Sequence, residues 1–444
     1  MKLLPSVERI NSMTSVKFSD LGLADPILSA LRARNHLTPT PIQVEAIPSL
    51  IKGRDVLGIA QTGTGKTGAF ALPVLHKFRH PRSKENIRRP LALVLAPTRE
   101  LAIQIGDEVG AYAAKMKLRH TVIFGGVREN RQISALKRGL DVLIATPGRL
   151  LDLHSRRFVD LSGIEYFVLD EADRMLDMGF VRDVRKILAC LPTGRQSLLF
   201  SATMPREIAR LADEMLRDPL RIEVAPQATP VDSIEQSVFH VAAGGGKTDA
   251  LRDVFADPAL SRVILFTRTK HRANRVADQL DKMGVPAAAI HGNKSQSARQ
   301  KALRRFSAGN CRVLVATDIA ARGLDIEGVT HVINYELPNE PENYVHRIGR
   351  TARAGASGVA IAFCDPSERK YLRDIERLLK MPLTVVGDVP KGEERAPARK
   401  QARGAKDRGG KTGGNDQSHK PGNGRKRRRR GRGKPSNRKQ TKIA

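Results

Sequence analysis

Short apolar runs alternate with longer amphipathic stretches along most of the chain. The runs are rich in Val, Ile and Leu, as the buried strands of parallel sheets are. A first set of predicted strands comprises 55–59, 91–96, 121–124, 141–145, 166–169 and 197–200. A second set comprises 236–241, 263–266, 287–290, 313–316, 331–334 and 359–363. The alternation therefore predicts two α/β domains of similar size, each a parallel sheet flanked by helices.

The stretches outside these two sets lack the alternation and set the predicted domain limits. Residues 1–45 are expected to form an N-terminal segment with one helix over 26–35 and another starting near Pro41, where closely spaced prolines fix a turn. Two prolines and no periodicity make 223–233 a predicted interdomain linker. The predicted domains are then 46–222 and 234–385, followed by a tail at 386–444. A cleft between two such domains is a common place for a ligand.

Composition allows proper hydrophobic cores and argues against a membrane protein. The chain of 444 residues is 40% apolar. No apolar run reaches the roughly 18 residues that a membrane-spanning helix needs. The N-terminus lacks the apolar segment of a signal peptide. Three scattered cysteines show neither metal-ligand spacing nor a disulfide framework, which favours a reducing cytoplasm.

The formal net charge of +31 predicts a polyanionic partner. About half of it lies in residues 391–444, which hold 20 Lys and Arg against 4 Asp and Glu. This segment is too poor in apolar residues to fold, so we expect a disordered tail that binds nucleic-acid phosphates. A solubilising tail or a targeting signal remains an alternative. Aromatic residues are only 4%, so nucleic-acid contacts should favour the backbone over stacked bases.

The run Ala60-Gln61-Thr62-Gly63-Thr64-Gly65-Lys66-Thr67 follows a predicted strand and opens a predicted helix. Small residues let backbone N–H groups approach anionic oxygens, and the helix N-terminus adds partial positive charge. Lys66 would reach the β- and γ-phosphates of a nucleotide, and the Thr67 hydroxyl would ligate Mg²⁺. The strict phosphate-loop pattern has Gly where this chain has Ala60, and an ordinary glycine-rich turn is the alternative.

An acidic cluster, Asp170-Glu171-Ala172-Asp173, follows the predicted strand 166–169. A carboxylate at the end of such a strand, beside a phosphate loop, is well placed to hold Mg²⁺, so we expect Asp170 to do so through water. Glu171 is then placed to deprotonate an attacking water. The alternative is a cluster that merely starts a helix.

A second Gly-Lys-Thr sequence occurs at Gly244-Gly245-Gly246-Lys247-Thr248, also between a predicted strand and a helix. Val241 stands where the first glycine of a phosphate loop belongs, so a second nucleotide site is not expected.

From about Phe18 to Phe363, the order of motifs resembles the DEAD-box RNA helicases, a family of superfamily-two P-loop ATPases. The basic tail is similar to that of the bacterial RhlE-type branch. The resemblance implies two tandem RecA-like domains, ATP as the substrate of hydrolysis and RNA as the partner. It also removes the objection to Ala60, which is usual in this family.

The resemblance implies roles for residues around the nucleotide. Phe18 would pack against adenine, and Gln43, the glutamine of the Q motif in the N-terminal segment, would read the adenine edge with its amide donor and acceptor. Asp325 would contact the ribose of ATP. Ser201 and Thr203 would couple hydrolysis to strand separation, with Asp173 as their partner.

RNA contacts are implied at strand ends of both domains, by groups that hold a phosphate or sugar without reading a base. Taken singly, each segment could be an ordinary capped turn. In the first domain the residues are Pro97, Thr98, Arg99, Gly125, Gly126, Thr146, Pro147, Gly148 and Arg149. In the second domain they are Thr267, Arg299, Thr317 and Gly323.

The segment His346-Arg347-Ile348-Gly349-Arg350-Thr351-Ala352-Arg353 matches the family's arginine motif. Arg350 and Arg353 would reach the γ-phosphate and neutralise charge in the transition state. Without the resemblance the cluster is typical of a solvated helix face. Family members often have Gly where this chain has Ala352, which we take as a minor exchange.

The sequence thus predicts an ATP-dependent RNA helicase in which ATP and RNA both favour closure of two domains. Three alternatives remain: a DNA helicase of the same superfamily, an ATP-gated RNA clamp without essential unwinding, and an RNA chaperone acting mainly through its tail.

Overall fold

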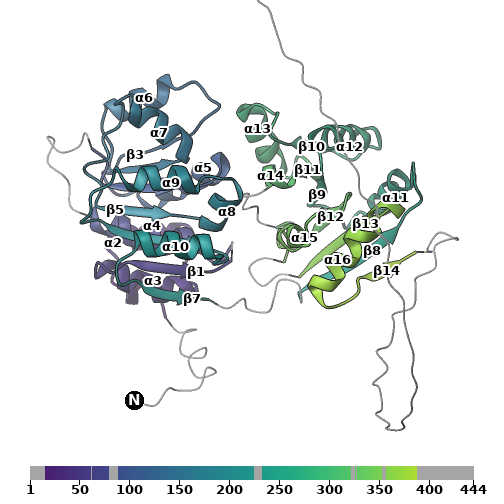
Figure 1. The fold of residues 1–444 in the computed structure, drawn as a ribbon, viewed down its shortest axis with the longest axis horizontal. Helices are drawn as coiled ribbons and strands as arrows, with labels where there is room; N and C mark the ends of the chain where they lie inside the picture. Colours follow the sequence, from purple (N-terminus) through teal and green to yellow (C-terminus); the bar gives the residue numbers. More distant parts are fainter. Residues whose placement is uncertain are drawn as a thin grey trace, which may run out of the picture. The chain divides into compact units, whose positions relative to one another are not determined.

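The computed structural model describes residues 16–61, 63–79, 89–224, 233–321, 326, 328–352 and 357–387. Within these ranges the strands form two seven-stranded sheets, and every strand pair is parallel. Figure 1 shows the strands of each sheet side by side, with helices against their faces. In the part of the chain that the structure describes, no helix is long and apolar enough to cross a membrane.

The first sheet has the strand order β3-β4-β2-β5-β6-β1-β7. Its strands are β1 (Val56–Ile59), β2 (Ala92–Leu95), β3 (His120–Ile123), β4 (Val142–Ala145), β5 (Tyr166–Leu169), β6 (Gln196–Ser201) and β7 (Leu220–Glu223). Its helices are the 3₁₀ helix η1 (Phe18–Leu21), α2 (Asp25–Ala33), α3 (Pro41–Ile51), α4 (Lys66–Lys77), α5 (Arg99–Tyr112), α6 (Asn130–Lys137), α7 (Pro147–Ser155), α8 (Ala172–Asp177), α9 (Val181–Leu188) and α10 (Arg206–Met215).

The second sheet has the strand order β10-β11-β9-β12-β13-β8-β14. Its strands are β8 (Ile234–His240), β9 (Val263–Thr267), β10 (Ala287–Ile290), β11 (Val313–Thr317), β12 (His331–Asn334), β13 (Gly358–Cys364) and β14 (Thr384–Val386). Its helices are α11 (Gly246–Phe255), α12 (Lys270–Lys282), α13 (Gln296–Ser307), α14 (Asp318–Ala321), α15 (Pro341–Ile348), the 3₁₀ helix η3 (Pro366–Glu368) and α16 (Arg369–Leu379).

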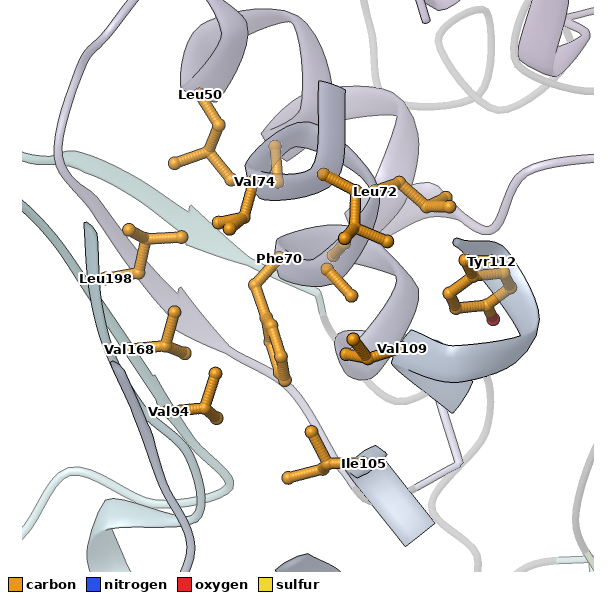
Figure 2. Packing of buried hydrophobic residues seen from close by; sticks show 14 of the residues in the cluster. Leu50, Phe70, Leu72, Val74, Val94, Ile105, Val109, Tyr112, Val168 and Leu198 are labelled. Atoms are coloured by element: carbon orange, nitrogen blue, oxygen red, sulfur yellow. The ribbon is translucent and has the colours of Figure 1, made fainter. Parts of the chain in front are cut away.

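Each sheet is buried on both faces, which explains the apolar runs in the sequence. Successive residues of β1 point to opposite faces, so Val56 joins one core cluster and Leu57 the other. Phe70 of α4 fills the first of these clusters. Figure 2 shows its ring between Val94 and Val168 of the sheet on one side and Ile105 and Val109 of α5 on the other. This packing fixes the helix that follows the predicted phosphate loop.

Two edge strands were not among the predicted ones. In β7, exposed Arg221 and Glu223 flank buried Ile222, so the strand lacks a continuous apolar run. The strand β14 is three residues long. Both pair with one neighbour only, β1 and β8 respectively, and an edge strand needs fewer apolar residues. Glu223 belongs to β7 rather than to the predicted linker, whose residues 225–232 lie outside the described part of the chain, as does the tail from 388 onward.

Carboxylates tie the strands together at the amino edge of the first sheet. Asp55, which precedes β1, accepts backbone N–H groups of Ser197 and Arg217, both at 2.8 Å. Asp141, which precedes β4, accepts the N–H of Arg119 at 2.9 Å. Each carboxylate therefore satisfies backbone donors at positions where the ladder of strand hydrogen bonds begins.

The two sheets share one strand order: numbered along its own sheet, each reads 3-4-2-5-6-1-7. The loop between β8 and α11, which contains the second Gly-Lys-Thr sequence, is thus the topological equivalent of the loop between β1 and α4. There, Lys247 donates to buried Glu368 and, at 2.8 Å, to the Tyr335 carbonyl. Because its ammonium group is already paired, Lys247 is a structural residue and not a phosphate ligand.

We expect Lys247→Met to destabilise the second α/β unit by about 3 kcal/mol, because it leaves the buried carboxylate of Glu368 with Arg268 as its remaining cation partner. Urea denaturation would measure the loss, with exposed Lys370→Met as the matched control. Loss of ATP binding at unchanged stability would contradict the structural role.

Candidate nucleotide site and nucleic-acid interface

The loop before α4 has the backbone that phosphate binding requires. Gly63 and Gly65 both lie at φ +87°, the left-handed region that favours glycine. A Cβ on Gly65 would also lie 2.6 Å from Nε2 of Gln43. The Thr64 hydroxyl donates to the Gln61 carbonyl at 2.7 Å and closes the turn. Ala60 is buried and donates its N–H to the Ser201 carbonyl at 3.0 Å, so the loop accommodates a methyl group where the strict pattern has glycine.

Lys66 and Asp170 place opposite charges at the carboxyl edge of the sheet. Lys66 is 6% exposed, and its Nζ has no hydrogen-bond partner among the described residues. An ammonium group that is buried and unpaired costs free energy until an anion binds. Burial raises the pKa of Asp170 from 3.8 to about 6 against the effect of nearby Lys66, while Glu171 raises it further. Both residues therefore fit a magnesium nucleotide.

Glu171 occupies a strained backbone conformation beside this pair. Its φ is +51°. Such a value is uncommon for a residue other than glycine, and backbone strain gathers at functional sites. Its N–H donates to Asp170 at 2.9 Å, and its carboxylate accepts Arg174 Nη1 at 2.7 Å. Glu171 is therefore held beside the predicted metal ligand by contacts on both its backbone and its side chain.

Magnesium binding is compatible with the few carboxylates at this edge. Among the described residues, no group of three or more His, Cys, Asp or Glu side chains could hold a metal by itself. A Mg²⁺ ion bound through one or two carboxylates, waters and phosphates needs no such group.

Gln43, expected to read adenine, is joined directly to the phosphate loop. Its Nε2 donates to the Gly65 carbonyl at 2.9 Å, and its Oε1 accepts the Thr40 N–H at 3.0 Å. One N–H and one lone pair of the amide stay available for a ligand. Phe18 is 6% exposed and belongs to the core cluster on that face of the sheet, so most of its ring already packs against protein.

The predicted contact between the acidic cluster and the Ser201–Thr203 segment is present. Asp173 Oδ2 accepts the N–H and the hydroxyl of Thr203 at 3.0 and 3.1 Å. The Ser201 hydroxyl receives the Asp173 N–H at 3.1 Å and donates to the Thr203 carbonyl at 2.8 Å. Three of these bonds join the segment after β5 to the segment after β6, and the fourth lies within the Ser201–Thr203 segment. Their role in coupling hydrolysis to strand separation stays a prediction.

The predicted RNA contacts of the first sheet gather at its carboxyl edge, because parallel strands end together. Pro97, Thr98 and Arg99 follow β2, Gly125 and Gly126 follow β3, and Thr146, Pro147, Gly148 and Arg149 follow β4. Residues from all three segments line one groove. Some also serve as capped turns: Thr98 Oγ1 accepts the Leu101 N–H at 3.2 Å, and Pro147 is the first residue of α7.

Gly126 holds the guanidinium of Arg99 against the backbone. It lies at φ +79°, and a Cβ there would be 2.6 Å from Arg99 Cζ. The glycine pair and the predicted phosphate-binding arginine therefore form one unit, although they are separate motifs in the sequence.

The predicted ligand contacts of the second α/β unit differ in how well their surroundings suit that role. Thr317 ends β11 and is half-buried. Thr267 is fully buried, with its hydroxyl donating to the Thr269 carbonyl at 3.2 Å, which leaves its side chain no open face for RNA. Arg299 on α13 has its Nη2 3.0 Å from Glu100 Oε2. Arg350 follows α15 and donates from Nε to the His346 carbonyl at 3.3 Å. Thr62, Gly323, Asp325 and Arg353 lie outside the described residues.

Arg347 and Ala352 depart from what the sequence suggested for the arginine motif. Arg347 is 1% exposed and pairs with both carboxylate oxygens of Asp318 at 2.6 and 2.8 Å, so it anchors α15 and is no solvated helix residue. Ala352 lies at φ +53°. An L-residue there is strained by about 1 kcal/mol, so the exchange of Gly for Ala is less minor than expected.

Comparisons with known proteins agree with this geometry. The DEAD/DEAH box helicase family model matches residues 40–211, and the helicase conserved C-terminal domain model matches residues 246–355. The Bacillus cereus DEAD-box ATP-dependent RNA helicase CshA is 43% identical over 388 residues, which cover 86% of this chain and 73% of that protein. The Buchnera aphidicola ATP-dependent RNA helicase DeaD is 43% identical over 381 residues, covering 86% and 62%. The solved structure of Saccharomyces cerevisiae Dbp5 bound to RNA and ADP BeF3 has a TM-score of 0.73 at 33% identity, over 83% of this chain and 95% of that chain.

Two RecA-like parallel sheets, with a phosphate loop and an acidic cluster at the carboxyl edge of the first, define a P-loop ATPase of the helicase type. The chain belongs to the DEAD-box ATP-dependent RNA helicases. The bacterial relatives compared are named CshA and DeaD, so the narrower RhlE-type branch stays a prediction.

We expect Asp170→Asn to stabilise the metal-free protein, because it removes a buried carboxylate whose pKa is raised to about 6. The gain should be about 1 kcal/mol, or roughly 3 °C in Tm. Because the pKa is raised, the folded state binds the proton of Asp170 more tightly than the unfolded state does. The stability that the wild type lacks relative to Asp170→Asn is therefore largest above pH 6, and it shrinks as the pH falls toward 3.8. Thermal unfolding in EDTA between pH 4.5 and 8 would measure it. An equal difference in Tm between the two proteins at pH 4.5 and at pH 8 would contradict the assigned cause.

We expect Gly126→Ala to weaken RNA binding about tenfold, because the new methyl group displaces the Arg99 guanidinium and adds left-handed strain. ATP affinity should be unchanged. Fluorescence anisotropy with labelled RNA and a non-hydrolysable ATP analogue measures both effects. The matched control is Gly194→Ala, where a Cβ meets no atom within 4 Å. Equal RNA affinity of the two variants would rule out the proposed support of Arg99.

Proposed function

We propose that this protein binds magnesium ATP on the first sheet and couples its hydrolysis to the local opening of RNA duplexes through closure of two domains. The observation that carries the proposal is the buried, unpartnered ammonium group of Lys66 at the N-terminus of α4. A phosphate group would pair with it and accept the N–H groups of the glycine loop at the same time. The named activities of the relatives and the RNA and ADP BeF3 bound to Dbp5 support the same choice of ligands.

Within this proposal the acidic edge divides the chemistry. Thr67 and Asp170 would hold Mg²⁺, Asp170 through water, and the ion would supply positive charge to the phosphates. Glu171 orients the attacking water and takes its proton, once its carboxylate exchanges Arg174 for that water.

Further residues, from both α/β units, would hold the nucleoside and relay the state of the site. Phe18, Gln43 and Asp325 hold the nucleoside. Asp173 passes the state of the site to Ser201 and Thr203 through the hydrogen bonds that join them.

The parts contributed by the second α/β unit make hydrolysis depend on closure. Arg350 and Arg353 would supply positive charge to the γ-phosphate, and Thr317, Gly323 and Arg299 would contact the RNA backbone. RNA and ATP then favour the same closed state, so each should increase the affinity for the other. Thr267 is the weakest of the predicted RNA contacts in this unit, because its side chain is buried.

The tail and the compartment complete the proposal. The 20 Lys and Arg of residues 391–444 would add salt-dependent affinity for RNA without sequence preference. We place the activity in the cytoplasm, since Cys190, Cys311 and Cys364 are free thiols, as is usual in a reducing compartment.

We expect RNA to stimulate ATP hydrolysis by the purified full-length chain, whereas Glu171→Gln should bind ATP and RNA but lower turnover at least about 100-fold. A coupled ATPase assay with and without RNA measures the first, and duplex unwinding measures its consequence. One rate with and without RNA would contradict the proposal.

Three controls separate the remaining alternatives. Single-stranded DNA that stimulates hydrolysis as well as RNA would favour a DNA helicase, and a Glu171→Gln protein that remodels RNA normally would favour a clamp. Removing residues 391–444 should lower RNA affinity and its salt dependence while leaving hydrolysis at saturating RNA intact. Loss of all remodelling in that truncation would favour a tail-driven chaperone.

A further inference from the structure

Gln132 on α6 joins segments of the RNA interface that are separate in the sequence. It lies in none of the motifs carried over from the family, yet its side chain is only 7% exposed. Such burial is unusual for a glutamine. A buried amide is retained when its hydrogen bonds are made, so its partners indicate its purpose.

The first partner is the backbone at the end of β3. Gln132 Nε2 donates to the Phe124 carbonyl at 3.1 Å, and Gln132 Oε1 accepts the Phe124 N–H at 3.2 Å. The amide thus uses its donor and its acceptor on one residue, as a neighbouring strand would. Phe124 directly precedes Gly125 and Gly126, so this pair of bonds fixes where the glycine loop begins.

The second partner is Arg149, at the start of α7. Its Nη1 lies 3.4 Å from the same Oε1, and its Nη2 lies 3.5 Å from the carbonyl of Val127, directly after the glycine pair. Asp152 lies 3.7 Å from Nε and faces the third side of the guanidinium. Each contact is long, but together they aim the guanidinium along the loop.

The glycine loop is consequently held at three points. Gln132 holds Phe124 before it, Arg149 reaches Val127 after it, and the Arg99 guanidinium covers Gly126 between them. A phosphate placed on the loop would meet Arg99 and Arg149 from either side. The Oε1 of Gln132 is the atom shared by the loop and by Arg149.

We propose that Gln132 is a positioning residue for RNA binding, which sets the glycine loop and the Arg149 guanidinium in one geometry through its side-chain amide. This inference rests on the proposed RNA role of the interface. It requires no contact between Gln132 and RNA.

The test is Gln132→Met, which keeps the length and volume of the side chain and removes its hydrogen bonds. We expect RNA affinity and the KM for RNA in the ATPase assay to weaken about tenfold. We expect changes of less than about twofold in ATP affinity, in hydrolysis without RNA and in kcat at saturating RNA. The slope of log RNA affinity against log salt concentration should become shallower by about the contribution of one phosphate contact. If Gln132 were only structural, Gln132→Met would lower Tm and would not raise the KM for RNA selectively over kcat.

The matched control is Gln196→Met in the same α/β unit. Gln196 also donates to backbone carbonyls, those of Leu50 and Arg54 at 3.1 and 2.6 Å, but it lies at the amino end of β6, the opposite edge of the sheet. If Gln132→Met is unstable, Gln132→Asn keeps the amide on a side chain too short to span both partners, and it should show the same split. RNA affinity equal to that of Gln196→Met would overturn the inference.

A double-mutant cycle with Arg149→Ala separates this inference from the proposed function. We expect Gln132→Met to weaken RNA binding clearly less in the Arg149→Ala background than in the wild type, because only its effect on the glycine loop remains. Full additivity would overturn the positioning role and leave the RNA interface standing. Unchanged RNA affinity of Arg149→Ala alone would overturn the interface itself, and the inference with it.

Discussion

The rest of the structure depends on holding one buried ammonium group in place without a hydrogen bond from the described part of the chain to neutralise it. Lys66 begins α4, and its Nζ is buried without a partner among the described residues. Such a group opposes folding, so the surrounding contacts must hold it in place. Phe70 anchors α4 in the core, and Gln43 bonds to the Gly65 carbonyl immediately before the lysine. An anion that enters the loop recovers the lost interaction, which makes nucleotide binding and local order favour each other.

The second sheet has the same topology, but the charged residues at the corresponding positions form ion pairs with neighbouring residues of the same unit. Lys247 occupies the place in the chain that Lys66 has in the first sheet, but it is paired with Glu368. Glu336 likewise follows β12 as Glu171 follows β5, and it lies beside Arg268 and Arg272. Because Lys247 and Glu336 are already paired with opposite charges, neither is available to bind a magnesium nucleotide. One strand order thus gives an open site in one copy and a closed ion-pair network in the other.

The sequence predicted most of the fold, because buried parallel strands leave continuous apolar runs. The strands 166–169, 287–290 and 331–334 are confirmed to the residue. Edge strands β7 and β14 escaped notice because an edge needs less apolar surface. The loop around Lys66 was predictable from its glycines, whose left-handed φ values few other residues tolerate. In contrast, the burial of Thr267 and Arg347, the left-handed Ala352 and the partners of Gln132 arise from tertiary contacts between distant segments, and no local pattern encodes them.

The two edges of the first sheet carry different kinds of polar residue. At the amino edge, the carboxylates of Asp55 and Asp141 accept backbone N–H groups and thereby hold neighbouring segments of the sheet together. At the carboxyl edge, polar atoms remain available to solutes. Thermal adaptation can therefore proceed by exchanging residues at one end of the strands while the chemistry at the other end is preserved. Lineages that share this fold could diverge in heat tolerance without any drift in what they act upon.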